Sequence, residues 1–161
     1  MGCCGELGLI GVLSGRFDHA LDDKGRVSIP ARFRDVLQAQ GHDRLYITNH
    51  VLEGERCLIL YPPREWEALA ARIKEKARFD RNVQLFETFY IGGAHEVEAD
   101  KQGRILIPPK LRSFAKLDRE VTFSAQIDQL QLWDRAALDR ILAAAENKFI
   151  SDPEFFGKLN L

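Results

Sequence analysis

The sequence predicts an α+β protein, mostly β, that is built from two copies of one unit. The first observation behind this prediction is a repeat: Leu21–Arg34 occurs again, in altered form, as Ala99–Arg112, at a constant offset of 78 residues. Six of the thirteen aligned pairs from residue 22 to residue 34 are identical. A chain made of two copies of one unit has built-in pseudo-twofold geometry, so a site carried by both copies exists twice at a fixed separation. The identical pairs are Asp22/Asp100, Gly25/Gly103, Arg26/Arg104, Ile29/Ile107, Pro30/Pro108 and Arg34/Arg112.

The second observation is a turn signature in each copy. Asp22 precedes Gly25, and Asp100 precedes Gly103, with the same spacing. An Asp at the first turn position accepts backbone N–H bonds, and a Gly three residues later can adopt a positive φ. The combination suits a three-residue loop built on a type I turn with a Gly bulge. The two middle residues differ between the copies, as such a turn permits.

The third observation is a common order of strands and a short helix around each turn. A strand is expected over Phe17–Leu21, and β-branched runs follow the turns at Val27–Ile29 and Ile105–Ile107. A proline ends each run and suits a first helical turn, so a short helix should follow. The side chains expected to point inward from these helices are Phe33, Val36, Leu37, Leu111, Phe114 and Ala115. The remaining strands are expected at Leu45–Thr48, Cys57–Tyr61, Glu120–Ser124 and Leu130–Trp133.

Further helices are predicted between the copies and after the second copy. Pro62–Pro63 opens the insert, apolar residues follow on a 3.6-residue period, and Gly92–Gly93 ends it. Asp134 is the expected N-cap of the C-terminal helix. The chain thus divides into a disordered leader at 1–14, a first unit at 16–63, a helical insert at 64–93, a second unit at 94–137, and a C-terminal helix and tail at 138–161.

Composition narrows the class of protein. With 161 residues, 45% hydrophobic and 29% charged, the chain resembles an ordinary soluble globular protein with one core or two small interdigitated ones. It contains no run of about 18 apolar residues, so no membrane helix is expected. The three cysteines are Cys3, Cys4 and Cys57, and their odd number indicates a reduced cytoplasmic protein. They also lack the spacing of a metal site, so neither a metal nor a cofactor is expected.

Basic residues are concentrated in two windows although the net charge is −1. The windows Lys24–Arg34 and Lys101–Arg112 hold eight of the 23 basic residues and no acid. If the copies pair about a pseudo-twofold axis, these residues form one cationic face, which is the electrostatic pattern of a phosphate-backbone binder. The candidate DNA-contacting residues are Lys24, Arg26, Arg32, Arg34, Lys101, Arg104, Lys110 and Arg112.

These candidates have a structural alternative. The four that fall in the predicted short helices could equally be the solvated side of a helix. Arg26 and Arg104 are different, because each opens a strand, where a β-branched or aromatic residue would be preferred. Retaining Arg in both copies indicates an ion pair with Asp22 or Asp100, a ligand contact, or both. We favour both roles, with Asp orienting Arg.

Enzymatic signatures are missing from the sequence. It contains no G-x-S-x-G, no H-E-x-x-H and no Walker-type phosphate loop, and its four histidines are scattered. A non-enzymatic protein is therefore predicted. His19 and His95 are expected to be half-buried strand residues, and Trp66 and Trp133 to pack in the core or at an interface.

Several segments together resemble the MraZ family, bacterial transcriptional regulators with two SpoVT-AbrB (AbrB-like) units in one chain. They are Gly15-Arg-Phe, the Asp-x-x-x-Arg turn followed by Ser-Ile-Pro, Leu60-Tyr-Pro with Trp66, and the second Asp-x-x-x-Arg turn with Ile-Leu-Ile-Pro, and they span residues 15 to about 145. The resemblance implies swapped-hairpin units that interleave into one pseudo-twofold β-barrel with added helices. It also implies that the DNA contact maps to Asp22 with Arg26 and Asp100 with Arg104.

The resemblance further implies ring-shaped homo-oligomers that bind repeated promoter boxes in double-stranded DNA. The expected targets are the protein's own promoter and the division and cell-wall gene cluster, with repression as the expected effect, in the cytoplasm at the nucleoid. The open alternative is a protein-interaction or assembly module whose basic faces bind an acidic partner. Residues 1–11 are expected to contribute nothing to folding. Candidates for the subunit contact are Trp66, Phe79, Phe86, Tyr90 and Phe155.

Overall fold

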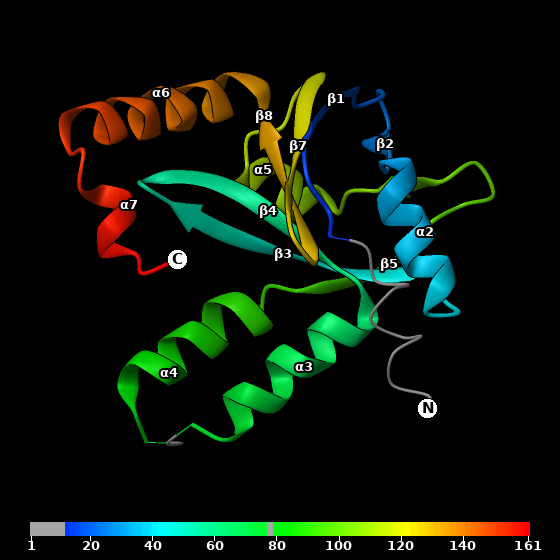
Figure 1. Cartoon of the computed structure of the whole chain (residues 1–161). Helices are drawn as coiled ribbons and strands as arrows, with labels where there is room; N and C mark the ends of the chain where they lie inside the picture. Colours follow the sequence, from blue (N-terminus) through cyan, green and yellow to red (C-terminus); the bar gives the residue numbers. More distant parts are fainter. Residues whose placement is uncertain (1–11, 77–78) are drawn as a thin grey trace, which may run out of the picture.

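A computed structural model, in which residues 12–76 and 79–161 are described, shows the predicted α+β protein, with a core built on β-sheet (Figure 1). Six strands form one antiparallel sheet in the order β1-β7-β8-β4-β3-β5, and β2 pairs with β6 in a separate two-stranded ribbon. The strands are β1 Arg16–Ala20, β2 Arg26–Ser28, β3 Arg44–Leu52, β4 Glu55–Tyr61, β5 His95–Glu98, β6 Arg104–Leu106, β7 Glu120–Gln126 and β8 Gln129–Asp134. The helices are α2 Ala31–Ala39, α3 Pro63–Lys74, α4 Arg81–Phe86, the π-helical segment η1 Glu87–Ile91, α5 Pro109–Phe114, α6 Arg135–Ser151 and α7 Phe155–Lys158.

The two copies exchange strands. Strand β1 of the first copy pairs with β7 of the second, and β5 of the second copy pairs with β3 of the first. In the ribbon, Val27 lies opposite Ile105, with the pair Arg26–Leu106 on one side and the pair Ser28–Arg104 on the other. The repeat offset of 78 residues relates Arg26 to Arg104 and Ser28 to Leu106. Exchanging the two copies therefore converts the pair Arg26–Leu106 into the pair Ser28–Arg104. The hydrogen-bond register of the ribbon therefore has the pseudo-twofold symmetry that the repeat predicts.

The strands do not close into one barrel. The six-stranded sheet is open between its edge strands β1 and β5. Each edge strand runs into a turn, and the strand that follows the turn, β2 or β6, uses its hydrogen-bonding groups for the ribbon instead of extending the sheet. A closed barrel needs every edge to be paired. The repeat and the mixed α+β character are confirmed, whereas closure of the barrel is not.

The main core lies between the inner face of the sheet and the ribbon. Val27 and Ile105 are each 1% exposed and contribute the apolar face of the ribbon. Helices α2 and α5 close this core, because most of the side chains predicted to point inward from them are buried. Phe114 is only partly buried: its ring lies 5.9 Å from that of Phe89, and the guanidinium of Arg56 lies 5.2 Å from its centre. The buried members of the predicted set are Phe33, Val36, Leu37, Leu111 and Ala115.

Helices cover the outer face of the central strands. Alternate residues of β4 point there, so Cys57 packs with Trp133 under α6, while Ile59 and Tyr61 pack with α3 and η1. In Figure 1, α6 accordingly lies on one side of the view and α3 with α4 on the other. Burial raises the pKa of the Cys57 thiol to about 12, so this cysteine stays protonated and acts as a small apolar side chain.

The ends of the predicted segments are shifted in the structure, most clearly at the leader and at the C-terminal helix. Leu13 is 5% exposed and exchanges backbone hydrogen bonds with Ile127, at 2.8 and 3.0 Å, so the last residues of the predicted leader belong to the folded protein. Residues 1–11 lie outside the described residues. Asp134 caps α6 as predicted, accepting from the Ala137 N–H at 3.2 Å, but the helix begins before the predicted end of the second unit. None of the described helices is long and apolar enough to cross a bilayer.

Candidate nucleic-acid interface

The turn of the first copy is built around one carboxylate. The Oδ1 atom of Asp22 accepts the backbone N–H groups of Lys24 at 2.9 Å and Arg26 at 2.8 Å. The Gly25 N–H donates to the Asp22 carbonyl at 3.0 Å, and Gly25 has a φ of +84°. These are the features of a type I turn followed by a Gly in the left-handed region, so the predicted turn is confirmed.

The turn of the second copy repeats this geometry. The Oδ1 atom of Asp100 accepts from the backbone of Gln102 at 2.8 Å and of Arg104 at 3.0 Å. The Gly103 N–H donates to the Asp100 carbonyl at 2.9 Å, with a φ of +76° at Gly103. The same backbone requirement therefore explains why Asp and Gly stand at both positions.

Each turn aspartate also forms an ion pair with the arginine that opens the next strand. Arg26 Nε donates to Asp22 Oδ2 at 2.9 Å, and Arg104 Nε donates to Asp100 Oδ2 at 3.2 Å. The backbone N–H of the paired arginine, with the guanidinium adding to it, lowers the pKa of each aspartate. Both carboxylates are thus ionised at neutral pH and hold the arginines through Nε. The two Nη groups of a guanidinium carry the other four of its five N–H donors.

The ribbon places both arginines on one face. Alternation buries Val27 and Ile105, so their neighbours point outward. Arg26 and Arg104 are diagonal on this outward face, two residues apart along the strands, which places their Cα atoms about 8 Å apart. Their side chains are 36% and 34% exposed. The outward face consists of Arg26, Ser28, Arg104 and Leu106.

The arginines that end each repeat lie against the turn of the other copy. Arg34 Nη2 donates to the Lys101 carbonyl at 2.9 Å, and its guanidinium covers Gly103. Arg112 covers Gly25 so closely that an added Cβ would lie 2.1 Å from its Nη1 atom. Both arginines are half-buried, so they brace the turns, a role that neither the DNA-contact prediction nor its solvated-helix alternative included.

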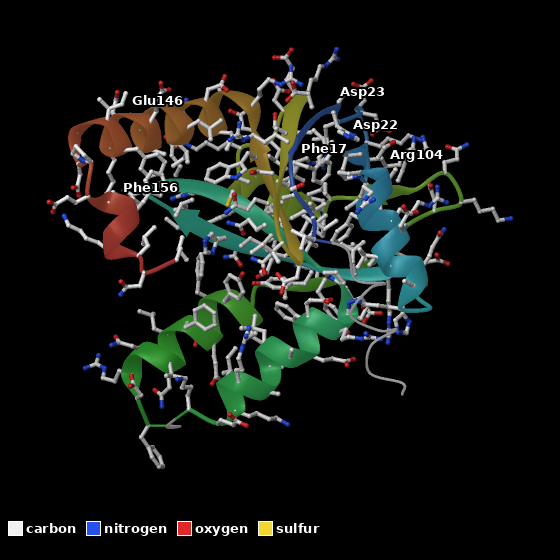
Figure 2. All side chains as sticks on the ribbon, in the orientation of Figure 1. Phe17, Asp22, Asp23, Arg104, Glu146 and Phe156 are labelled. Atoms are coloured by element: carbon white, nitrogen blue, oxygen red, sulfur yellow. The ribbon has the colours of Figure 1, made fainter. Side chains whose placement is uncertain are left out.

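The other predicted basic residues are exposed. Lys24 and Lys101 lie at the tips of the two turns, while Arg32 and Lys110 lie in the first turns of α2 and α5. Figure 2 shows Asp22, Asp23 and Arg104 on the same side of the molecule, away from Glu146 and Phe156. The structure thus brings the two turns together through the ribbon.

The sequence interpretation missed three residues of this region. Ser28 and Leu106 share the outward face with the arginines, and the alternation within Arg-Val-Ser and Arg-Ile-Leu was the signal that could have identified them. Asp23 also lies at the first turn, where its Oδ1 atom is 3.3 Å from Nη2 of Arg119. This acidic residue immediately precedes the acid-free window.

The predicted subunit-contact residues occupy different environments. Trp66 stacks on Tyr46 with centroids 5.3 Å apart, and Tyr90 is 3% exposed with its hydroxyl 2.6 Å from that of Tyr61. Phe86 stacks on Tyr90 yet remains 40% exposed. Phe79 is 92% exposed, and Phe155 packs against Phe149 and Phe156. The exposed members, Phe79 and Phe86, have surface to offer a partner, whereas Tyr90 packs inside the chain.

The two predicted strand histidines differ in burial. His19 meets Phe123 edge-on at 5.2 Å, and burial lowers the pKa of its imidazole. His95 is exposed, contrary to the prediction, because β5 is an edge strand. Trp133 is fully buried in the core, as expected. Within residues 12–76 and 79–161, no three His, Cys, Asp or Glu side chains gather where they could hold a metal ion.

The fold and the outward face of the β2–β6 ribbon define a class of protein. It is a tandem-repeat α+β protein that presents two ion-paired arginines on one β-ribbon. Comparison with known proteins identifies the family. The family model described as "MraZ protein, putative antitoxin-like" matches residues 12–88 and 90–155. The chain is 38% identical over 147 residues to a protein of Acidithiobacillus ferrooxidans named transcriptional regulator MraZ, covering 90% of this chain and 95% of that protein.

A protein of the same name from Shewanella oneidensis is 41% identical over 117 residues, which are 73% of this chain and 76% of that protein. A third, from a Shewanella strain, is 40% identical over the same length. The chain belongs to the MraZ family. The matched residues include both turns and the whole ribbon, so the family assignment covers the region described above.

Proposed function

We propose that this protein is a non-enzymatic transcriptional regulator that binds double-stranded DNA through its two turns and the ribbon between them. The observation that carries the proposal is the pair Arg26 and Arg104, each oriented by its own aspartate and both on one outward face. Arginine suits this role because its planar guanidinium makes paired hydrogen bonds to guanine or phosphate. The relatives named as transcriptional regulators support it.

The proposed target is a set of repeated boxes in the protein's own promoter, within the division and cell-wall gene cluster, with repression as the result. Support for the target comes from family membership and not from the geometry. The protein would act at the nucleoid in the cytoplasm. Lys24 and Lys101 at the turn tips, with Arg32 and Lys110, would add phosphate contacts on either side of the arginines. Arg34 and Arg112 would act by holding the turns.

A ring of subunits is the proposed binding unit. One chain offers few basic contacts and has a net charge of −1, so one chain on one box should bind weakly. Linked copies can raise avidity by about 10² to 10⁴ without new contacts. Exposed apolar side chains of the insert and tail support self-association: Phe79, Leu85, Ile150 and Phe156 are 92, 69, 71 and 60% exposed.

The deciding experiment compares two double variants in binding the DNA upstream of the gene. Arg26→Ala with Arg104→Ala should lose roughly 1–3 kcal/mol of binding free energy per arginine. The control, Arg64→Ala with Arg140→Ala, removes the same charge from helices α3 and α6 and should bind nearly as the wild type does. Circular dichroism of all variants establishes that they are folded. Equal affinity of the two double variants would refute DNA binding by the turns.

Salt dependence separates DNA from an acidic protein partner. For DNA, log K should fall steeply with log[salt], with a slope of about −0.9 per phosphate contact. Light scattering should show a species several times the 18.3 kDa of one chain. Removal of all but one box should then weaken binding sharply. A monomer that binds one box as tightly as the full array would refute the ring.

A further inference from the structure

We infer that the outward face of the β2–β6 ribbon enters the major groove, and that Leu106 contacts a thymine methyl group there. Ser28 occupies the equivalent position in the other copy. The two halves of the ribbon would therefore read different bases. This inference rests on the proposed DNA-binding function and names two further residues that determine specificity.

The register places these two residues among the arginines. Leu106 lies directly opposite Arg26, and Ser28 lies directly opposite Arg104. All four side chains share one face, because alternation sends Val27 and Ile105 into the core. A ligand that reaches both guanidinium groups must therefore pass over Ser28 and Leu106. The ribbon cannot bind DNA through its arginines on this face and leave these two side chains uncontacted.

The shape of the ribbon matches the major groove. That groove is about 12 Å wide and admits a two-stranded β-ribbon, whereas the minor groove is about half as wide. The two turns flank the ribbon at opposite ends, because the Ile107 N–H donates to the Gly25 carbonyl and the Ile29 N–H donates to the Gly103 carbonyl, both at 2.9 Å. A ribbon in the groove would thus bring one turn to the backbone on each side.

The chemistry of the two side chains differs. Leu106 is 53% exposed, and it is an apolar side chain placed beside two cations. The thymine C5-methyl is the apolar group that the major groove presents to such a side chain. The Ser28 hydroxyl can instead donate to or accept from a base edge or a phosphate oxygen. At the remaining ribbon positions the copies agree, with Arg at both ends and Val27 matched by Ile105. Position 28/106 is thus where the halves differ.

The test uses full-length protein and the upstream duplex, in which each thymine of a box is replaced in turn by uracil, which lacks the methyl group. The wild type should lose about three- to fivefold in affinity at one thymine, the effect expected for one methyl-sized apolar contact. Leu106→Ser should bind the thymine and uracil duplexes equally. Ser28→Leu should gain sensitivity at a second, symmetry-related position. Leu52→Ser, which changes another exposed strand leucine, should keep the wild-type pattern.

Each outcome decides a separate question when Arg26→Ala with Arg104→Ala is measured in parallel. If that double variant loses binding but Leu106→Ser keeps the wild-type response to uracil, the ribbon inference is wrong while the proposed function stands. If no thymine is sensitive in the wild type, the contact of Leu106 with a thymine methyl group is likewise refuted. If the arginine variant binds as the wild type does, the proposed function and the ribbon inference both fail. Because Leu106 and Ser28 are exposed, the variants should fold, which circular dichroism checks.

Discussion

The two turns have the same backbone conformation and hydrogen bonds, but their tip residues differ. Asp22 and Asp100 each accept the backbone N–H of the arginine four residues later, and each pairs with the Nε atom of that arginine. Between Asp and Gly, however, the first turn has Asp23 and Lys24, whereas the second has Lys101 and Gln102. The comparison teaches that the backbone of the turn determines which residues must repeat. The residues that the backbone leaves free set the charge that a ligand meets.

The tips should therefore attract DNA unequally. Residues 22–26 include two acids and two bases, a sum of zero, whereas residues 100–104 include one acid and two bases, a sum of +1. The pairing of Asp23 with Arg119 offsets little of this difference, because both side chains are highly exposed, at 91% and 78%. The second turn should be the stronger contact to phosphate.

The largest expected effect is on affinity when the arginines are removed singly. Arg104→Ala and Arg26→Ala should each cost roughly 1–3 kcal/mol of binding free energy. Arg104→Ala should cost more, because its turn carries the extra positive charge and contributes more of the binding. Fluorescence anisotropy with labelled promoter DNA measures both. A larger loss for Arg26→Ala would reverse the proposed ranking of the turns.

The next effect is on stability when a turn glycine is replaced. Gly25→Ala and Gly103→Ala should each lose about 1–2 kcal/mol of unfolding free energy, because an L residue is strained at positive φ. Gly25→Ala should lose more, since its Cβ would lie 2.1 Å from Arg112 Nη1 and would displace that guanidinium from the turn, whereas the Cβ at Gly103 would lie 3.0 Å from Arg34 Nη1.

Urea denaturation measures the losses caused by these glycine variants. Gly54→Ala is the matched control, with a φ of +76° and no heavy atom within 4 Å of the added Cβ. Its loss of unfolding free energy should come only from placing an alanine at a positive φ. If Gly54→Ala costs as much as Gly25→Ala, the contact between Arg112 and the opposite turn adds nothing to stability.

Exchanging the tip charges should give a smaller effect on affinity. Asp23→Lys should tighten DNA binding, and Lys101→Asp should weaken it, each by about 1 kcal/mol at low salt. Both changes should shrink as salt rises, because the tips are exposed and the Debye length falls to about 8 Å at physiological ionic strength. Titrations at several salt concentrations provide the measurement. A change that persists at high salt would indicate a direct contact and not a field effect.

The smallest expected effect is an acid-dependent loss of stability that the two turns should share equally. Asp22 and Asp100 have lowered pKa values in the folded protein. The stability they contribute is therefore present above their unfolded pKa, about 4, and is lost as pH falls through the folded values. Asp22→Asn and Asp100→Asn should each reduce that loss by a similar small amount. Melting temperatures of the wild type and both variants, measured across this acidic range, provide the test. A clearly larger effect of one variant would show that the two aspartates contribute unequally to stability.

Local chemistry made the turns predictable from sequence. Asp and Gly at fixed spacing specify the backbone whatever surrounds it, and the same holds for Asp134, whose carboxylate caps the next helix. Burial of the inward helix side chains, such as Phe33 and Leu111, followed from their apolar character. The Asp–Arg pairs were predictable as well, because their partners are four residues apart in the chain.

What the sequence could not determine depends on which strand lies beside which. The pairing of β2 with β6, which places Arg26 and Arg104 on one face beside Leu106, joins residues far apart in the chain. The same holds for Arg34, whose half-buried guanidinium is hydrogen-bonded to the opposite turn, and for Leu13, whose backbone pairs with Ile127. Sequence by itself determined the two turns and their ion pairs, because those contacts are local. Tertiary structure alone decided that they form one surface, because only strand pairing between the copies aligns them.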